Sequence, residues 1–327
     1  ARAIVAEMEH EGGALRGEDL ADHRSEWVEP ISMSYRGSRL WECPPNGQGL
    51  IALVALGVLS RLEERWGIGD AQDFPDGLLL HAITEALRQA FAVGRRAVGE
   101  PEAGTAWQEL ITDAALDELA NPLSPDRSLA PAADRVAGAG TDTVYLCAVD
   151  RWGNACSFIN SNFMGFGTGI VPAGCGYTLQ NRGHGFVLEQ GLPNSLGPGR
   201  RPYHTIIPAM LSPDTEDGLT APLGVMGGMM QPQGHLQVVR ALCVDALDPQ
   251  AALDRARIQL ADGRPDGAVL CEAEADAVAL SARGHEVQVV PPESRAAFGL
   301  GQVILQTANS NWAGSDPRGD GLALAEG

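Results

Sequence analysis

The feature that most constrains this chain is a change of pattern near its middle, where a linker gives way to a strand. Residues 121–140 contain three prolines, end in Ala-Gly-Ala-Gly and show no hydrophobic periodicity. Residues 144–149, Val-Tyr-Leu-Cys-Ala-Val, are typical of a strand. We therefore predict an exposed linker that can accommodate a chain cut, followed by the first strand of a new unit.

Thr143 stands at this boundary. If the chain is cut between Asp142 and Thr143, Thr143 carries both a hydroxyl and a free α-amine. An α-amine with an ordinary pKa of about 8 can accept the hydroxyl proton near neutral pH, so one residue can supply nucleophile and base. The alternative is a threonine that merely begins a strand, as β-branched residues often do.

Composition bounds the class of protein. The chain has 327 residues, of which 44% are hydrophobic and 20% charged, so it can bury a sizeable core. A formal net charge of -19 argues against a nucleic-acid partner, because phosphates require a basic surface. The longest apolar run, residues 50–59, is about half of the roughly 18 residues that span a bilayer, so no membrane span is predicted.

Metal and nucleotide cofactors find no matching motif. The six cysteines form no CxxC pair, and the seven histidines form no HxxxH or HExxH arrangement. Residues 165–169 read GxGxG, so they lack the third glycine at the GxGxxG spacing of a dinucleotide-binding loop. No GxxxxGK[ST] sequence occurs. We therefore predict no metal and no cofactor.

The first half of the chain is predicted to be mainly helical. Residues 1–10 are typical of the middle of an amphipathic helix, with no initiator methionine, so we expect an upstream part that is missing here. A rigid Pro- and Gly-rich turn at residues 44–49 leads into an apolar helix. Further helices are predicted from residue 16, at 50–62 and at 74–97, with a hairpin at 31–35 and 39–41.

The second half mixes strands and helices. Strands are predicted at 144–149, 155–159, 206–211, 223–226, 269–270 and 286–290, and helices at 236–246 and 249–257. Periodicity alone supports a mixed α and β protein and no particular topology.

Several motifs give the chain a family resemblance. They are Thr143 to Asp150, Gly153-Asn154-Ala155, Gly167-Thr168-Gly169-Ile170, Pro198-Gly199-Arg200-Arg201-Pro202, Gly224-Val225-Met226-Gly227-Gly228 and Ser315-Asp316-Pro317-Arg318. In this order the chain resembles the gamma-glutamyltranspeptidase family of N-terminal-nucleophile hydrolases. The resemblance implies an α+β fold, a four-layer αββα sandwich. It also implies self-cleavage before Thr143, so that residues 1–142 are the C-terminal part of a large subunit ending in the linker 121–142, and residues 143–327 are the small catalytic subunit.

The resemblance also assigns the site. Thr143 would be the nucleophile, and Gly227 and Gly228 would form the oxyanion hole, because glycines after a strand and before a helix can offer backbone N–H groups. A tight strand-to-helix turn is the alternative for the glycines. A gap-free count puts Ser161 at the family's hydroxyl position, whereas bringing Asn160 or Asn162 to the family's amide position would need a bulge.

The residues that would bind the acyl group depart from the family pattern. His204 and Thr205 stand in place of a Ser-Ser pair, and His184 and Gly185 in place of two aspartates that hold the substrate's ammonium. Without those carboxylates, Arg182 and His184 suit an anionic acyl group instead. The segment 187–198 is shorter than the lid loop of many members, which predicts an open pocket.

The resemblance predicts an amidohydrolase or acyltransferase that uses a threonyl acyl-enzyme. The donor would be the γ-glutamyl group of glutathione or a similar small amide, and the acceptor water, an amino acid or a peptide. One alternative is a glutaryl- or cephalosporin-type acylase of the same fold. A second is an unprocessed, non-catalytic relative.

Overall fold

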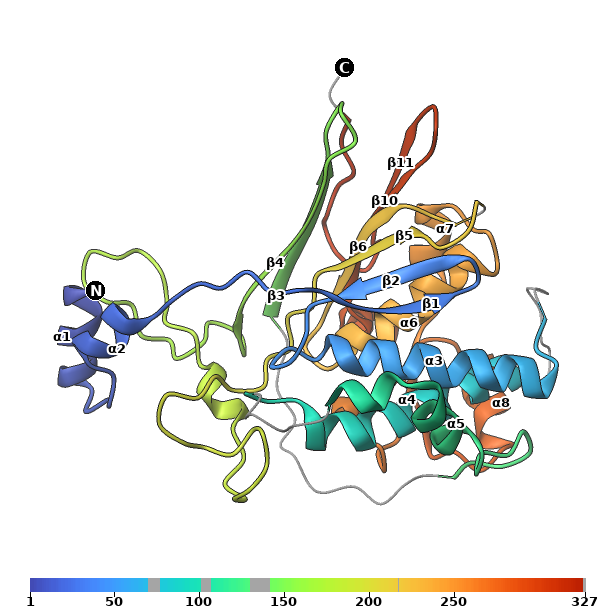
Figure 1. Cartoon of the computed structure of the whole chain (residues 1–327), viewed down its shortest axis with the longest axis horizontal. Helices are drawn as coiled ribbons and strands as arrows, with labels where there is room; N and C mark the ends of the chain where they lie inside the picture. The colour runs from blue at the N-terminus through green and yellow to red at the C-terminus, as the bar shows by residue number, and fades with distance from the viewer. Residues whose placement is uncertain (70–76, 101–106, 130–141, 217, 326–327) are drawn as a thin grey trace.

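A six-stranded antiparallel sheet lies at the centre of the structure, a computed structural model that describes residues 1–69, 77–100, 107–129, 142–216 and 218–325. Its strand order is β1-β2-β5-β6-β10-β11 (Figure 1). The strands are β1 (Ile31–Tyr35), β2 (Ser38–Glu42), β5 (Ala209–Pro213), β6 (Ala221–Met226), β10 (Leu300–Gln306) and β11 (Asn311–Ser315).

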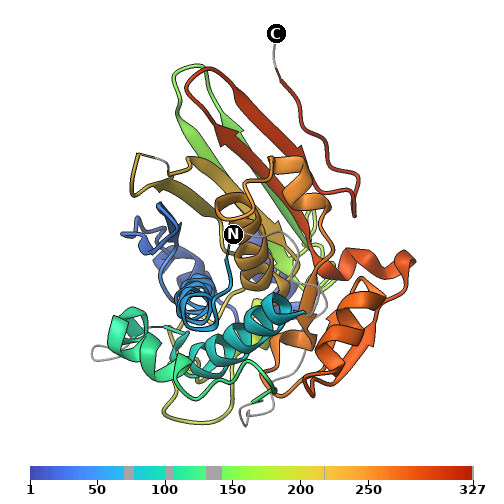
Figure 2. The same ribbon diagram turned by 90° about the vertical axis from the view of Figure 1, so that its right-hand side faces the viewer.

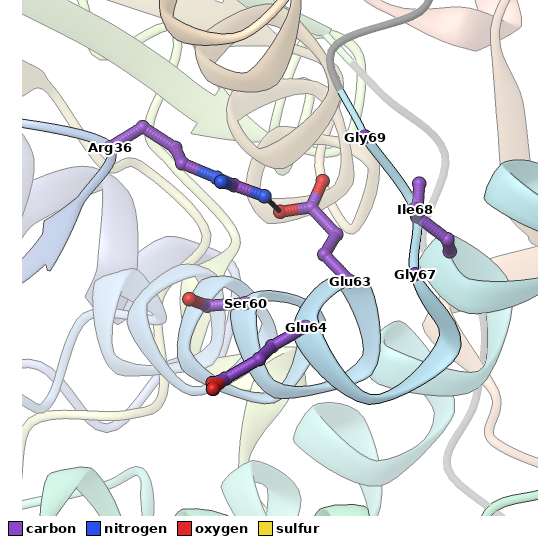
Figure 3. A pocket seen from close by; sticks show the side chains of 7 residues that line it. All are labelled: Arg36, Ser60, Glu63, Glu64, Gly67, Ile68 and Gly69. Carbon is purple, nitrogen blue, oxygen red and sulfur yellow. Dashed lines mark hydrogen bonds and ion pairs between the residues drawn. The ribbon is translucent and has the colours of Figure 1, made fainter.

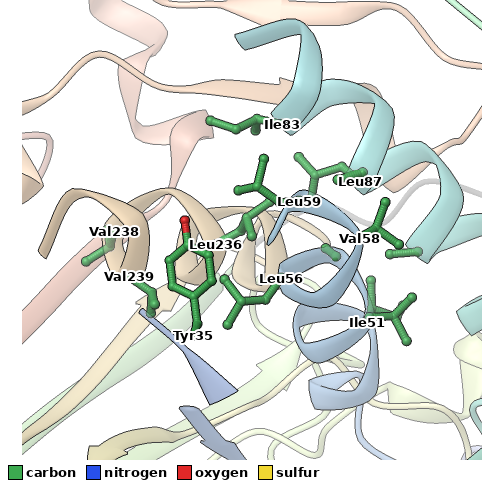
Figure 4. Close-up of a cluster of buried hydrophobic side chains, with 14 of the residues drawn as sticks. Tyr35, Ile51, Leu56, Val58, Leu59, Ile83, Leu87, Leu236, Val238 and Val239 are labelled. Carbon is green, nitrogen blue, oxygen red and sulfur yellow. The ribbon is translucent and has the colours of Figure 1, made fainter. Parts of the chain in front are cut away.

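Helices cover one face of this sheet and contain most of the core. They are α3 (Gly49–Trp66), α4 (Leu78–Ala97) and α6 (Met230–Cys243). Because the first half of α3 is apolar all round, it can be stable only when it is buried on every side. Figure 4 shows the resulting cluster, in which side chains of α3 meet those of α4 and α6. Gly234 lets α6 approach β6 closely, since a Cβ there would lie 2.6 Å from Val225 Cγ1.

A long hairpin covers the opposite face of β6. It consists of β3 (Asp142–Val149) and β4 (Ala155–Phe163), joined by a turn that the Asp150 carboxylate fixes by accepting from Trp152 N and Asn154 N, both at 2.9 Å. The ring of Tyr145 lies against Gly224, where an added Cβ would approach it to 2.4 Å. Val225 faces α6 and Gly224 faces the hairpin, so β6 lies between two layers.

The hairpin's outer face is apolar and exposed. Val144, Leu146 and Phe158 are 64%, 47% and 49% exposed, and no helix among the described residues covers them. The predicted α+β fold is confirmed: the described residues form a helical layer, the central sheet and a second β layer (Figures 1 and 2).

A smaller sheet packs beside α4. Its order is β7-β8-β9, with β7 and β8 antiparallel and β8 and β9 parallel. The remaining elements are β7 (Ile258–Leu260), β8 (Val269–Cys271), β9 (Val287–Val289), α1 (Arg2–His10), α2 (Gly17–Asp22), α5 (Asp113–Ala120), α7 (Pro249–Asp254), α8 (Glu274–Ser281) and four 3-10 helices, Trp107–Ile111, Arg182–Gly185, Ala261–Gly263 and Pro292–Phe298. No helix of the described part of the chain is long and apolar enough to cross a bilayer.

Most predicted elements are present, with shifted boundaries. The strand predicted from residue 206 begins at Ala209, and the helix predicted from residue 236 begins at Met230. The first turns of α6 were missed because Pro232 and Gly234 are poor helix formers, although proline is tolerated in a first turn. The helices α5 and α8 and the strands β10 and β11 were not predicted. Most of the predicted linker, residues 130–141, lies outside the described residues.

The contact of Tyr145 with Gly224 generates a prediction about stability. Gly224→Ala should lower the free energy of unfolding by about 1–3 kcal/mol, because the new methyl must displace the Tyr145 ring from a packed layer. Urea denaturation measures the change. Gly17→Ala is the control, since a Cβ there meets nothing within 4 Å and the free energy should change by about 0.5 kcal/mol or less. Equal effects at the two positions would contradict the packing described.

Candidate active site

Thr143 lies at the start of β3, buried to 5% exposure. Its Oγ1 donates a hydrogen bond to Ser161 Oγ at 3.1 Å, and Phe163 N donates to the same oxygen at 2.9 Å. The strand register is irregular between Asp142 and Val144, opposite Phe163, whose φ is 80°. Thr143 is still joined to Asp142, so its nitrogen is an amide and stands in for the amine that a cut would release.

Gly227 and Gly228 form the turn between β6 and α6. Their φ angles of 137° and 59° lie in the left-handed region that favours glycine. Their carbonyls accept from Met230 N at 3.0 Å and Gln231 N at 3.2 Å, so the pair is built into the beginning of α6. The N-terminal end of a helix favours negative charge, which is the property that an oxyanion site needs.

The hairpin crosses β6 so that the start of β3 is directed toward the end of β6. Ser157, which pairs with Cys147, donates to Leu223 O at 3.4 Å, and Tyr145 contacts Gly224. Toward the start of β3, the contacts with β6 therefore move toward the end of β6. The contacts between β3 and β6 thus run in the direction of the glycine turn that follows β6.

Arg182 contacts the ring next to this end of the hairpin. Its guanidinium carbon lies 5.1 Å from the centroid of the Phe163 ring, and its Nη1 donates to Thr205 Oγ1 at 3.2 Å. The residue is 8% exposed, and burial lowers its pKa to about 10, so it stays charged at neutral pH. Among the described residues no carboxylate lies within salt-bridge distance of Arg182, and its Nη2 has no hydrogen-bond partner. The side chain is thus a buried positive charge that an anionic ligand would stabilise.

His204 and Thr205 lie beside Arg182. Burial, with a smaller contribution from the positive charge of Arg182, lowers the pKa of His204 to about 4, so its imidazole is neutral at pH 7. Gly47 gives the ring room, since a Cβ there would lie 2.8 Å from His204 Cε1. The turn at residues 44–49 packs against this region, since Gln48 N donates to His204 O at 3.1 Å and Gly47 forms a β-bridge with His204.

Gln48, in that turn, connects the two halves of the site and was not predicted. Its Nε2 donates to Thr205 O at 2.7 Å and to Gly228 O at 2.8 Å, while its Oε1 accepts from Tyr203 Oη at 2.7 Å. It is fully buried. A continuous path of contacts therefore runs from Thr143 through Ser161, Phe163, Arg182, Thr205 and Gln48 to Gly228. The sequence signal was the glutamine inside a Pro-Asn-Gly-Gln-Gly turn.

Other predicted residues lie elsewhere. Asn160 pairs with Val144 on the hairpin's outer, exposed face, so the structure does not bring its side chain to Thr143, because neighbours in a strand alternate between faces. Asn162 instead donates to Thr178 Oγ1 at 2.8 Å and holds the following loop. His184 is exposed, and Gly185 is held by Asn194, whose Nδ2 donates to its carbonyl at 2.6 Å.

A surface cavity and a group of potential metal ligands both lie away from this site. A cavity of about 400 Å³ is lined by Arg36, Glu63 and the residues around the C-terminal end of α3 (Figure 3). Since α3 has 18 residues and is about 27 Å long, this cavity is far from the turn at its other end. Within the described chain, the group of side chains able to hold a metal is His81, Glu85 and His285, on and beside α4.

Comparisons with known proteins agree with this geometry. Residues 1–326 match the family model for gamma-glutamyltranspeptidase. The crystal structure of a cephalosporin acylase from Bacillus halodurans covers 100% of this chain at 42% identity with a TM-score of 0.87, and the match takes in 58% of that chain. The oxamate amidohydrolase proenzyme of Klebsiella pneumoniae is 31% identical over 93% of this chain and 57% of its own length.

A further relative is the glutathione hydrolase-like YwrD proenzyme of Bacillus subtilis, 28% identical over 99% of this chain and 61% of its own length. The chain therefore spans about three-fifths of the relatives it matches. Fold and comparisons together define the class as N-terminal-nucleophile hydrolases. Within that class, the chain belongs to the gamma-glutamyltranspeptidase family, whose relatives named here include an acylase, an amidohydrolase and a glutathione hydrolase-like proenzyme.

The lowered pKa of His204 generates a prediction about pH. Between about pH 6.5 and 4 the unfolded state binds a proton at His204 that the folded state does not, so acidification destabilises the fold. His204→Gln removes the titrating imidazole. Between pH 7 and pH 4, the free energy of unfolding of this variant should therefore fall by about 1–3 kcal/mol less than that of the wild type. Urea denaturation at several pH values measures it, and the exposed His10→Gln variant should follow the wild type. Parallel curves for wild type and His204→Gln would refute it.

Proposed function

We propose that the mature protein is an amidohydrolase whose nucleophile is Thr143 and whose preferred substrates are amides with an anionic acyl group. The observation that carries the proposal is a buried threonine hydroxyl, hydrogen-bonded to Ser161, at the start of a hairpin that packs against β6. The names of the relatives support an amide-cleaving reaction in general.

Maturation would begin in the chain as it stands here. Thr143 Oγ1 attacks the carbonyl carbon of Asp142, the C–N bond to Thr143 breaks, and the nitrogen leaves as the α-amine of Thr143. Water then hydrolyses the resulting ester, which restores the Thr143 hydroxyl and leaves Asp142 with a free main-chain α-carboxylate. The products would be a subunit ending at Asp142 and a subunit of residues 143–327, which stay associated because β2 pairs with β5 in the central sheet and α3 packs against α6.

Turnover would use the same hydroxyl. The new α-amine accepts the proton of Thr143 Oγ1 as that oxygen attacks the substrate's acyl carbon. The backbone N–H groups of Gly227 and Gly228 would stabilise the oxyanion, and Ser161 would hold the hydroxyl in place. The amine proton then passes to the leaving nitrogen, and water or an amino compound resolves the acyl-enzyme.

Arg182 supports an anionic acyl group. A buried guanidinium without a described carboxylate partner gains most from a ligand that brings one. A γ-glutamyl group also brings an ammonium, which needs a carboxylate that His184 and Gly185 do not provide. A dicarboxylic acyl group such as glutaryl meets the charge of Arg182 and leaves no ammonium unpaired.

The second candidate is transfer or hydrolysis of a γ-glutamyl group, as from glutathione. It is kept because the Bacillus subtilis relative is named glutathione hydrolase-like. Under this alternative, the partner of the ammonium would come from residues other than His184 and Gly185.

The first test is processing of the complete precursor. Incubated wild-type precursor should yield a fragment that begins at Thr143, whereas Thr143→Ala should stay intact and inactive and Thr143→Ser should retain both processing and turnover. Intact mass measurement detects the fragments. Because residues 143–327 contain no lysine, an amine-specific reagent should label this fragment once, on Thr143, and should block turnover. A stable uncleaved wild-type precursor would favour the non-catalytic alternative, and turnover by Thr143→Ala would remove Thr143 from its role.

The second test addresses the acyl group. Arg182→Gln should lower kcat/KM for a glutaryl anilide by about 10–150-fold, the equivalent of one charge-assisted hydrogen bond, and should leave an uncharged butyryl anilide within about 3-fold. Arg151→Gln is the matched control, because Arg151 lies in the turn at the other end of the hairpin. Equal losses for both anilides would refute anion recognition by Arg182, and better turnover of a γ-glutamyl than of a glutaryl anilide would favour the second candidate.

A further inference from the structure

Two histidines and a glutamate converge inside the helical layer, away from the candidate active site. His81 and Glu85 are one turn apart on α4, so they lie on the same face of the helix, and His285 comes from the segment between α8 and β9. His81 and Glu85 are fully buried and His285 is 4% exposed. The proposed acyl chemistry makes no use of any of them.

The three side chains offer ligand atoms at one point. His81 Nδ1 and His285 Nε2 are 2.7 Å apart, Glu85 Oε1 lies 3.9 Å from His285 Nε2, and all three ligand atoms lie within 4.8 Å of one another. We infer that His81, Glu85 and His285 form a binding site for a divalent transition metal of the zinc type. The inference is independent of the proposed function.

Surrounding groups already orient these ligands as a metal site requires. His81 Nε2 donates to Ser124 O at 2.8 Å, which leaves the lone pair of Nδ1 directed at the cluster. The ring of Trp66 stacks on His81 at a centroid distance of 5.4 Å and an angle of 9°, so the imidazole plane is fixed. Glu85 accepts from Ser128 Oγ and from Leu129 N, both at 3.0 Å.

Binding needs only a small rearrangement. Tetrahedral zinc bonds of 2.0–2.1 Å place ligand atoms roughly 3.3 Å apart, so the two imidazoles would separate slightly and the carboxylate would move closer. The metal would take the place of the proton now shared by His81 Nδ1 and His285 Nε2. That proton can move to His285 Nδ1, which has no hydrogen-bond partner among the described residues, so the imidazole stays neutral.

The ligand set and nearby charges select the kind of ion. Two nitrogens and one carboxylate suit zinc, cobalt or nickel, whereas calcium and magnesium require mostly oxygen ligands. Arg88 Nε lies 3.9 Å from Glu85 Oε1, and Arg283 donates to Pro125 O close by. These positive charges offset part of the carboxylate's attraction, so binding relies on the nitrogen ligands, which hard cations use poorly.

The site would hold three parts of the chain together. It would join α4 to the unit formed by α8 and the small sheet, and through Ser124, Ser128 and Leu129 it would fix the segment that leads toward Asp142 and Thr143. Metal binding would therefore stabilise the fold in proportion to the free metal concentration.

The experiment measures metal binding by the complete protein after treatment with EDTA. Titration with Co²⁺ should give the intense visible absorption of a tetrahedral complex at about one equivalent, and Zn²⁺ should abolish that absorption and raise the melting temperature. Glu85→Gln and His285→Asn should each weaken Zn²⁺ binding by at least about 100-fold, beyond the 10–100-fold typical of changes outside the ligand set. A control with His10→Asn and His23→Asn removes two exposed imidazoles and should bind like the wild type.

Two results with the wild type and its ligand variants would overturn the metal site. Wild-type protein that binds neither Zn²⁺ nor Co²⁺ at micromolar concentration, or Glu85→Gln and His285→Asn that bind as the wild type does, would overturn it. An octahedral cobalt spectrum lost in the His10 and His23 control would assign the binding to the surface and would also overturn it. If a ligand variant fails to fold, the wild-type cobalt spectrum and its displacement by Zn²⁺ decide the matter.

Discussion

The structure of the candidate site depends on the contact between Tyr145 and Gly224. Because no side chain stands at residue 224, the Tyr145 ring of β3 packs directly against the backbone of β6. The start of β3, which carries Thr143, is thereby directed toward the end of β6, which the Gly227–Gly228 turn follows, although the two strands belong to different layers. The site is thus a property of how two β layers cross, and only secondarily of the residues near Thr143 in the sequence.

A second constraint is the burial of polar groups around Arg182. Gln48 uses its amide nitrogen and oxygen to satisfy two backbone carbonyls and the hydroxyl of Tyr203, so the glycine turn is held rigidly. Arg182, by contrast, keeps an Nη2 without a partner among the described residues. A buried guanidinium with such an atom favours an anionic ligand, because a ligand carboxylate recovers the cost of burying the charge.

The sequence predicted the elements better than the contacts between them. Hydrophobic periodicity located α3, the two hairpins and the strand before the glycine turn, and motif order singled out Thr143, Ser161, Gly227 and Gly228 as candidates. It could not locate Gln48, because a buried glutamine in a turn has no pattern of its own until its partners are known. The family resemblance proposed Asn160 or Asn162 as an amide near Thr143 only if a bulge intervened, and the alternation of β4 directs Asn160 outward. The start of α6 was missed because Pro232 and Gly234 are poor helix formers that the packing against β6 nevertheless requires.

The His81, Glu85 and His285 cluster was invisible for the same physical reason. Its first two members follow helical spacing, but the third lies about 200 residues away in the sequence and is brought in only when the small sheet docks on α4. Histidine motifs with local spacing therefore describe only sites whose ligands share one element. Here the fold itself assembles the ligands, and the same contacts fix Ser128 and Leu129 on the path to Thr143. The helical layer thus holds the chain before the proposed cut, at Ser128 and Leu129, while contacts of β3 with β6 hold the chain after it.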